Sequence, residues 1–260
     1  MLDLVFVVDN SGSISFNSPD NWDIMKSFLV EVVKGLGVIG GGGAQVGMVQ
    51  FGDDAISAFH LRDYTDQQAL IDAIRRADFH DRGTTNTEAA LRMMRAEQFT
   101  AGNGDRPGAA NVALLLTDGQ ATSSDHLREA DQAKADGINI IAIGITNSVN
   151  PDELRMISSP PQIENQNYFL TTDFGRLDQI VLSLVQQTCS VASTLPPTTT
   201  AAYEPITTTR IIPQTCESYQ RTTRTNLARR SKWLVFVVFY IILYSYRVSH
   251  SEAFYVRYIS

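Results

Sequence analysis

Apolar residues along most of the chain form short continuous runs that alternate with segments of helical spacing. The runs predict buried strands over residues 2–8, 45–51, 55–61, 110–116, 138–145 and 168–171. The helical spacing predicts helices over residues 21–36, 65–77, 85–99, 125–136, 151–158 and 174–187. Strands that alternate with helices are typical of an α/β fold, a mostly parallel, doubly wound sheet with helices on both faces.

One connection breaks this parallel pattern. Only Gly52, Asp53 and Asp54 separate the strands predicted at 45–51 and 55–61. A link this short requires antiparallel pairing, so 55–61 is predicted to be an antiparallel edge strand. Asp53 and Asp54 are then expected to be solvated residues of a hairpin turn.

Composition divides the chain into unequal parts. Apolar residues make up 43% of the sequence, which is enough for a packed core. The net charge of −7 is uneven, because residues 1–189 carry about −12 and residues 190–260 about +5. An acidic globular part argues against nucleic acid as a partner, since phosphate binding needs a basic face.

We therefore predict a domain over residues 1–189, a Thr/Pro-rich linker over 190–213, and a basic and then apolar tail over 214–260. Cys189 and Cys216 lie outside the main apolar pattern. They can bridge each other, pair with other chains or remain free thiols, and their number does not reveal the compartment.

The apolar stretch 233–246 is the candidate membrane segment. It is 14 residues long, whereas a spanning helix needs about 20. It is interpreted as a marginal membrane anchor, a buried or interfacial segment, or non-native coding sequence. Arg229, Arg230 and Lys232 precede it, and the positive-inside tendency would place residues 1–189 on the cytoplasmic side.

The candidate chemistry begins where the first strand ends. Asp9, Ser11 and Ser13 follow residues 2–8 in the segment Asp9-Asn10-Ser11-Gly12-Ser13. Ligand sites of open α/β sheets lie at the carboxyl ends of the strands. Carboxylate and hydroxyl oxygens suit Mg²⁺, Ca²⁺ or Mn²⁺, and the absence of His and Cys from this segment argues against zinc or copper.

Two further loops contribute oxygen-bearing residues at the ends of predicted strands or the start of a predicted helix. Thr85 lies in Gly83-Thr84-Thr85, just ahead of a predicted helix, and Asp118 follows the buried strand 110–116. Together with Asp-x-Ser-x-Ser at residues 9–13, these positions resemble the metal-ion-dependent adhesion site (MIDAS) of von Willebrand factor type A (VWA) domains, which are found in matrilins and non-fibrillar collagens.

The resemblance implies a Rossmann-like VWA fold and a role for each residue. Ser11, Ser13 and Thr85 would offer hydroxyls to a bound Mg²⁺ (or Mn²⁺ or Ca²⁺), and Asp9 and Asp118 would bind it largely through water. An Asp or Glu carboxylate of a protein ligand, for instance collagen or another matrix protein, would complete the coordination. The implied function is adhesion in the extracellular matrix or at the cell surface, without catalysis.

Each residue of the proposed metal site also has an ordinary structural explanation when it is taken alone. Asp9, Ser11, Ser13 and Asp118 are also ordinary turn residues, and Thr85 is also a candidate helix N-cap. A dinucleotide site is not expected at Gly35–Gly40, because this GxGxxG pattern follows a helix and precedes a strand. An enzyme would need a phosphate-binding loop or a general base, and neither is evident. The histidines are scattered and expected at the surface: His60, His80, His126 and His250.

The start of the chain bears on localisation. Met1 runs directly into the first predicted strand, without a secretory signal. Taken literally, this predicts an intracellular VWA subunit that mediates assembly of a protein complex. We favour the alternative, that the sequence is a fragment or begins at a misplaced start codon, and that the protein is extracellular or at the cell surface.

Overall fold

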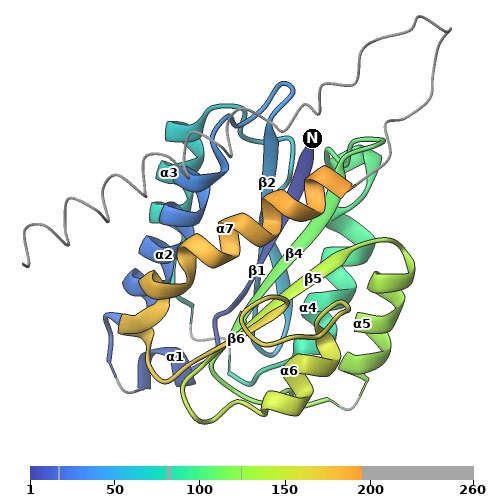
Figure 1. Ribbon diagram of the computed structural model, residues 1–260. Helices are drawn as coiled ribbons and strands as arrows, with labels where there is room; N and C mark the ends of the chain where they lie inside the picture. Colours follow the sequence, from blue (N-terminus) through green and yellow to red (C-terminus); the bar gives the residue numbers. More distant parts are fainter. Residues whose placement is uncertain (17, 81–82, 124, 195–260) are drawn as a thin grey trace, which may run out of the picture. The chain divides into compact units, whose positions relative to one another are not determined.

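A twisted sheet of six strands organises the described part of this computed structural model, which comprises residues 1–194 except 17, 81–82 and 124. The strand order is β3-β2-β1-β4-β5-β6 (Figure 1). The strands are β1 (Leu2–Asp9), β2 (Ala44–Phe51), β3 (Ala55–Phe59), β4 (Ala110–Thr117), β5 (Asn139–Ile145) and β6 (Tyr168–Thr171). All pairings are parallel except that of β2 with β3. The predicted fold class is confirmed.

Helices cover both faces of the sheet. In chain order they are α1 (Ser13–Phe16), α2 (Asn21–Leu36), α3 (Gln67–Arg76), α4 (Thr87–Met93), α5 (His126–Ala135), α6 (Pro151–Ile157) and α7 (Leu177–Thr194). Helix α2 packs against α3 and α7 on one face, and α4, α5 and α6 follow one another on the other (Figure 1).

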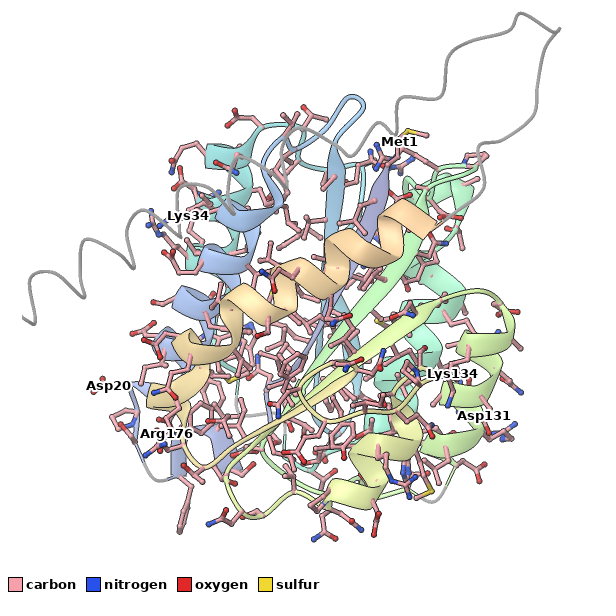
Figure 2. All side chains as sticks on the ribbon, in the orientation of Figure 1. Met1, Asp20, Lys34, Asp131, Lys134 and Arg176 are labelled. Carbon is pink, nitrogen blue, oxygen red and sulfur yellow. The ribbon has the colours of Figure 1, made fainter. Side chains whose placement is uncertain are left out.

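Strand β1 shows how the sequence builds this core. Successive side chains of a strand point to opposite faces of the sheet. Val5 and Val7 belong to a cluster with Leu91 of α4 and Ala130 of α5. The alternate residues 4, 6 and 8 are equally buried, so β1 is covered on both sides. On the outer surface, Figure 2 shows Lys34 and Asp131 pointing away from the core.

The predicted hairpin is present. Strand β3 pairs antiparallel with β2, with Phe51 opposite Ala55, and a register shift lies between Met48 and Val49. The edge strand ends at Phe59, two residues earlier than predicted.

Some helix boundaries differ from the predicted ones. Helix α4 begins at Thr87, because the side chain of Asn86 accepts a hydrogen bond from the backbone N of Ala89 and so provides the N-cap. The interpretation of Thr85 as the N-cap is therefore wrong. After Met93 the predicted helix continues as a π-helix, Met94–Gln98. Asp20 precedes α2, and its side chain makes no capping hydrogen bond.

The parallel arrangement gathers several loops at one edge of the sheet. In Figure 1 the chain starts at the top of β1, and β1 ends near α1 at the lower edge. Strands β1 and β4 are adjacent and parallel, so the loops that follow Asp9 and Thr117 meet there.

An ion pair fixes the opposite edge. Asp3 is fully buried on β1, and the Nη2 of Arg106 lies 2.6 Å from its Oδ1. The Nε of Arg106 donates to the same carboxylate oxygen at 2.9 Å, and its backbone N donates to Oδ2 at 2.8 Å. Burial nevertheless raises the pKa of Asp3, so desolvation outweighs the stabilising effect of Arg106.

The predicted linker and tail, including residues 233–246 and Cys216, lie outside the described residues. The side chain of Cys189 is not described either, so its pairing stays an open prediction. Within residues 1–194, and leaving aside the gaps named above, the helices are all too short or too polar to cross a membrane.

Candidate metal centre

The loop after β1 contributes three of the five predicted ligands. Asp9 ends the strand, and its Oδ1 accepts a hydrogen bond of 2.9 Å from the backbone N of Ser11. This bond folds the chain back at once, which brings Ser11 Oγ within 3.0 Å of Ser13 Oγ. Ser13 then begins α1. The spacing of two residues therefore puts both hydroxyls on the same side of the loop.

The other two predicted residues lie against this loop. Ser13 Oγ donates to Asp118 Oδ1 at 2.6 Å, and Thr85 Oγ1 donates to Ser11 Oγ at 3.5 Å. A Cβ at position 119 would lie 3.1 Å from Thr85 Oγ1, so Gly119 leaves room for this approach. All five side chains, predicted from three distant segments, thus lie together. Their role as metal ligands stays a prediction.

Most of this cluster is withdrawn from water. Asp9 is 0% exposed and Asp118 4%, while Ser13 is exposed. Burial raises the pKa of Asp9 to about 6, against the lowering effect of hydrogen bonds from Ser11 and Thr117. Burial likewise raises the pKa of Asp118. Both carboxylates therefore hold their negative charge at a cost that a nearby cation would offset.

The donor set fits a hard divalent cation. It offers three hydroxyl and two carboxylate groups, with no nitrogen or sulfur, and such oxygen ligands suit Mg²⁺, Mn²⁺ and Ca²⁺. Because Ser13 is the exposed member, solvent or another molecule reaches the cluster on that side. The arrangement can hold a cation and leave it accessible.

Thr117 is a supporting residue that the sequence did not reveal. Its Oγ1 donates to Asp9 Oδ2 at 2.7 Å, and it accepts a hydrogen bond from the backbone N of Gly119 at 3.2 Å. Both oxygens of Asp9 are therefore fixed by donors of the protein. The only signal in the sequence is that a hydroxyl residue immediately precedes Asp118 at the end of a strand.

Asp53 is a second supporting residue that the sequence did not reveal. It was expected to be a solvated turn residue, and it is exposed, as is Asp54. However, its Oδ1 accepts hydrogen bonds from both the backbone N and the Oγ1 of Thr84, the neighbour of Thr85. These bonds hold the pKa of Asp53 below its usual range.

The expectation that all histidines lie at the surface is wrong for His126, which is only 7% exposed. Its Nδ1 contacts the carbonyl oxygen of Ser123, and its Nε2 lies 3.9 Å from Glu153 Oε1. The same Glu153 oxygen accepts a hydrogen bond from the backbone N of Ala121 at 3.0 Å. His126 and Glu153 therefore support the loop that follows Asp118. His80 is exposed, His60 is half-buried, and His250 lies outside the described residues.

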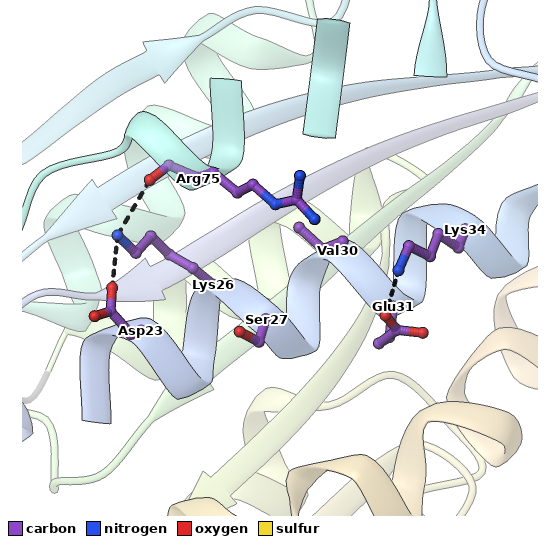
Figure 3. A pocket seen from close by; sticks show the side chains of 7 residues that line it. All are labelled: Asp23, Lys26, Ser27, Val30, Glu31, Lys34 and Arg75. Atoms are coloured by element: carbon purple, nitrogen blue, oxygen red, sulfur yellow. Dashed lines mark hydrogen bonds and ion pairs between the residues drawn. The ribbon is translucent and has the colours of Figure 1, made fainter. Parts of the chain in front are cut away.

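A pocket of about 240 Å³ lies elsewhere, between α2 and α3 (Figure 3). It is lined by Asp23, Lys26, Ser27, Val30, Glu31, Lys34 and Arg75. Its charges are paired within the protein, since Lys26 lies 2.9 Å from Asp23 and Lys34 lies 2.6 Å from Glu31. The pocket contains none of the five predicted site residues and is a weaker candidate for function than the oxygen cluster.

Comparisons with known proteins agree with the fold. The family model described as von Willebrand factor type A domain matches residues 3–182. Human matrilin-1 is 36% identical over 188 residues, which cover 72% of this chain and 36% of matrilin-1. The mouse collagen alpha-4(VI) chain is 37% identical over 191 residues, which cover 72% of this chain and 8% of the collagen chain. The chain thus matches only a minor part of these relatives.

Among solved structures, proximal thread matrix protein 1 from the mussel byssus has a similar fold. The TM-score is 0.68 at 27% sequence identity, covering 73% of this chain and 48% of that chain. In that structure the MIDAS motif is occupied by zinc. A related protein therefore binds a divalent cation at its MIDAS.

Proposed function

This chain belongs to the von Willebrand factor type A family, and on that basis we propose that residues 1–189 form a divalent-cation-dependent protein-binding module. The observation that supports the proposal most is the convergence of Asp9, Ser11, Ser13, Thr85 and Asp118 at one edge of the sheet. Similarity to matrilin-1 and to a collagen VI chain supports an adhesive role.

In this proposal each group has a distinct task. The hydroxyls of Ser11, Ser13 and Thr85 are direct ligands, and Asp9 and Asp118 supply negative charge, largely through water. A bound Mg²⁺, or Mn²⁺ or Ca²⁺, would supply an electrophilic position that accepts a carboxylate oxygen from a partner. Thr117 and the backbone of Ser11 hold Asp9 in place for this purpose.

We propose a protein ligand that offers an Asp or Glu, with collagen or another matrix protein as the first class to test. Exposed Ser13 marks the side from which such a carboxylate would arrive. We further propose that the protein acts extracellularly or at the cell surface, and that it binds without catalysing a reaction. The carboxylates of Asp9 and Asp118 already accept hydrogen bonds from their own chain, an arrangement suited to holding charge.

Isothermal titration of the full 260-residue chain with Mg²⁺, after treatment with EDTA, tests the cation site. Ser13→Ala removes a proposed ligand at an exposed position, so the fold should tolerate it. Ser15→Ala is the matched control, because Ser15 lies in the same short helix and its hydroxyl only donates weakly to the carbonyl oxygen of Gly12, at 3.4 Å.

We expect Mg²⁺ binding by the wild type and by Ser15→Ala, and a loss of at least about tenfold in affinity for Ser13→Ala. A wild type that binds neither Mg²⁺ nor Mn²⁺, or equal affinities for both variants, would contradict the cation site. Retention of the chain on a collagen-coated surface with Mg²⁺ and with EDTA tests the partner class. Retention that EDTA leaves unchanged would contradict binding through the cation.

A further inference from the structure

The turn between β2 and β3 contacts the loop that carries Thr85. Asp53 Oδ1 accepts hydrogen bonds from Thr84 N at 2.8 Å and from Thr84 Oγ1 at 2.7 Å. One carboxylate oxygen therefore binds both the backbone and the side chain of the residue that precedes Thr85.

The same turn also binds the residue that follows Thr85. Asn86 Nδ2 donates to the carbonyl oxygen of Asp53 at 3.0 Å, and Asn86 N donates to the carbonyl oxygen of Gly52 at 2.8 Å. Thr85 itself makes none of these contacts. It is held from both sides, because each of its neighbours is fixed to the hairpin turn.

Gly83 makes this close approach possible. Its φ is +71°, and a Cβ there would lie 2.2 Å from Asp53 Oδ2, which is closer than any real contact. The carbonyl oxygen of Gly83 accepts a hydrogen bond of 3.2 Å from the backbone N of Gly12, between Ser11 and Ser13. The loop around Thr85 is thus connected to the hairpin turn on one side and to the loop after β1 on the other.

We propose that Asp53 is a positioning residue of the cation site. Its carboxylate fixes Thr84, while backbone carbonyl oxygens of the turn hold Asn86, and together these bonds aim the hydroxyl of Thr85 at Ser11. Cation affinity then depends on a turn that contributes no ligand. This inference rests on the proposed function, and extends it to a part of the chain outside the five-residue pattern. Partners that orient ligands in this way typically account for a 10- to 100-fold effect on metal affinity.

A simpler explanation is that any exposed carboxylate near the site attracts a cation through its charge. Asp54 separates the two explanations. It is the next residue, carries the same charge and is also exposed. It contacts the turn through its backbone, where its carbonyl oxygen accepts a hydrogen bond from Gly52 N. Asp54→Ala therefore removes the same charge from the same turn and leaves the bonds to Thr84 intact.

The experiment compares Mg²⁺ affinities of the full chain and its variants Asp53→Ala, Asp54→Ala and Asp53→Asn by isothermal titration. We expect Asp53→Ala to weaken binding at least about tenfold and Asp54→Ala to change it by less than about twofold. Asp53→Asn should recover much of the affinity, because the amide oxygen still accepts from Thr84 although the charge is lost. Amide hydrogen exchange of Thr84 in the absence of Mg²⁺ should accelerate in Asp53→Ala alone.

The outcomes distinguish the positioning role of Asp53 from the cation site itself. Wild type that binds Mg²⁺, with equal losses in Asp53→Ala and Asp54→Ala or no recovery in Asp53→Asn, overturns the positioning role and leaves the cation site standing. Wild type that binds neither Mg²⁺ nor Mn²⁺ overturns the proposed function and this inference together. Thermal melts without Mg²⁺ show whether each variant is folded.

Discussion

Replacing Asp9 by Asn should change how the stability of the cation-free protein depends on pH. Burial raises the pKa of Asp9 from 3.8 to about 6 in the folded state. A carboxyl whose pKa is raised by folding destabilises the folded state once it is ionised. Its contribution is thus most favourable below pH 3.8 and is lost as the pH rises through about 6.

The size of this effect follows from the shift. A difference of about two pKa units corresponds to about 3 kcal/mol at pH 7, of which about 1 kcal/mol develops between pH 5 and pH 7. For a domain of this size, 1 kcal/mol changes Tm by about 2–4 °C. Asp9→Asn removes the titrating group and preserves the shape, since the amide oxygen can still accept from Ser11 N and the Thr117 hydroxyl can accept from the amide.

The assay is thermal unfolding in EDTA, for wild type and Asp9→Asn, at pH 5, 6 and 7. Other buried carboxyls titrate in both proteins, so the difference between the two melting temperatures isolates Asp9. We expect the Tm of wild type relative to the variant to fall as the pH rises. A difference that is constant across this range, or that changes in the opposite direction, would refute the reasoning. In millimolar Mg²⁺ at pH 7 only wild type should gain appreciable Tm.

Two further predictions concern other parts of the domain. Arg106→Ala should lower the free energy of unfolding by about 3–5 kcal/mol, because it leaves the fully buried carboxylate of Asp3 without its partner. Urea unfolding measures this change, and a loss below about 1 kcal/mol would mean that Asp3 is protonated or solvated. Phe16→Ser should change the free energy of unfolding by less than about 0.5 kcal/mol, because Phe16 is 86% exposed. A larger loss of unfolding free energy in the same assay would show that Phe16 packs against the protein.

Much of the fold and the whole five-residue cluster could be predicted from the sequence, for two physical reasons. Strands buried on both faces must be continuously apolar, which makes β1 and β4 conspicuous. The cluster follows directly from these strands, because the carboxyl ends of parallel neighbours lie at one edge of the sheet. A family pattern that spans three loops then identified which polar residues of that edge belong together.

The supporting residues could not be predicted in the same way. An aspartate in a hairpin turn is ordinary turn chemistry, and only the folded chain brings Asp53 to Thr84, 31 residues away. His126 is a single polar residue at the start of a helix, and no periodicity marks its burial. The π-helix after Met93 was also missed, since its residues have the same apolar spacing as an α-helix.

The same placement that assembles the cluster gives a physical reason for the cation binding that we propose. The sheet edge brings Asp9 and Asp118 close together and excludes water from both, and each effect disfavours a second negative charge. Serine and threonine hydroxyls can orient these carboxylates but cannot neutralise them. A divalent cation would reduce this cost and, because the hydroxyl ligands carry no charge, would keep positive charge to attract an acidic partner. Cation binding and the stability of the folded domain then both depend on the same arrangement of charge. Substitutions of supporting residues such as Thr117 and Asp53 should therefore affect both together.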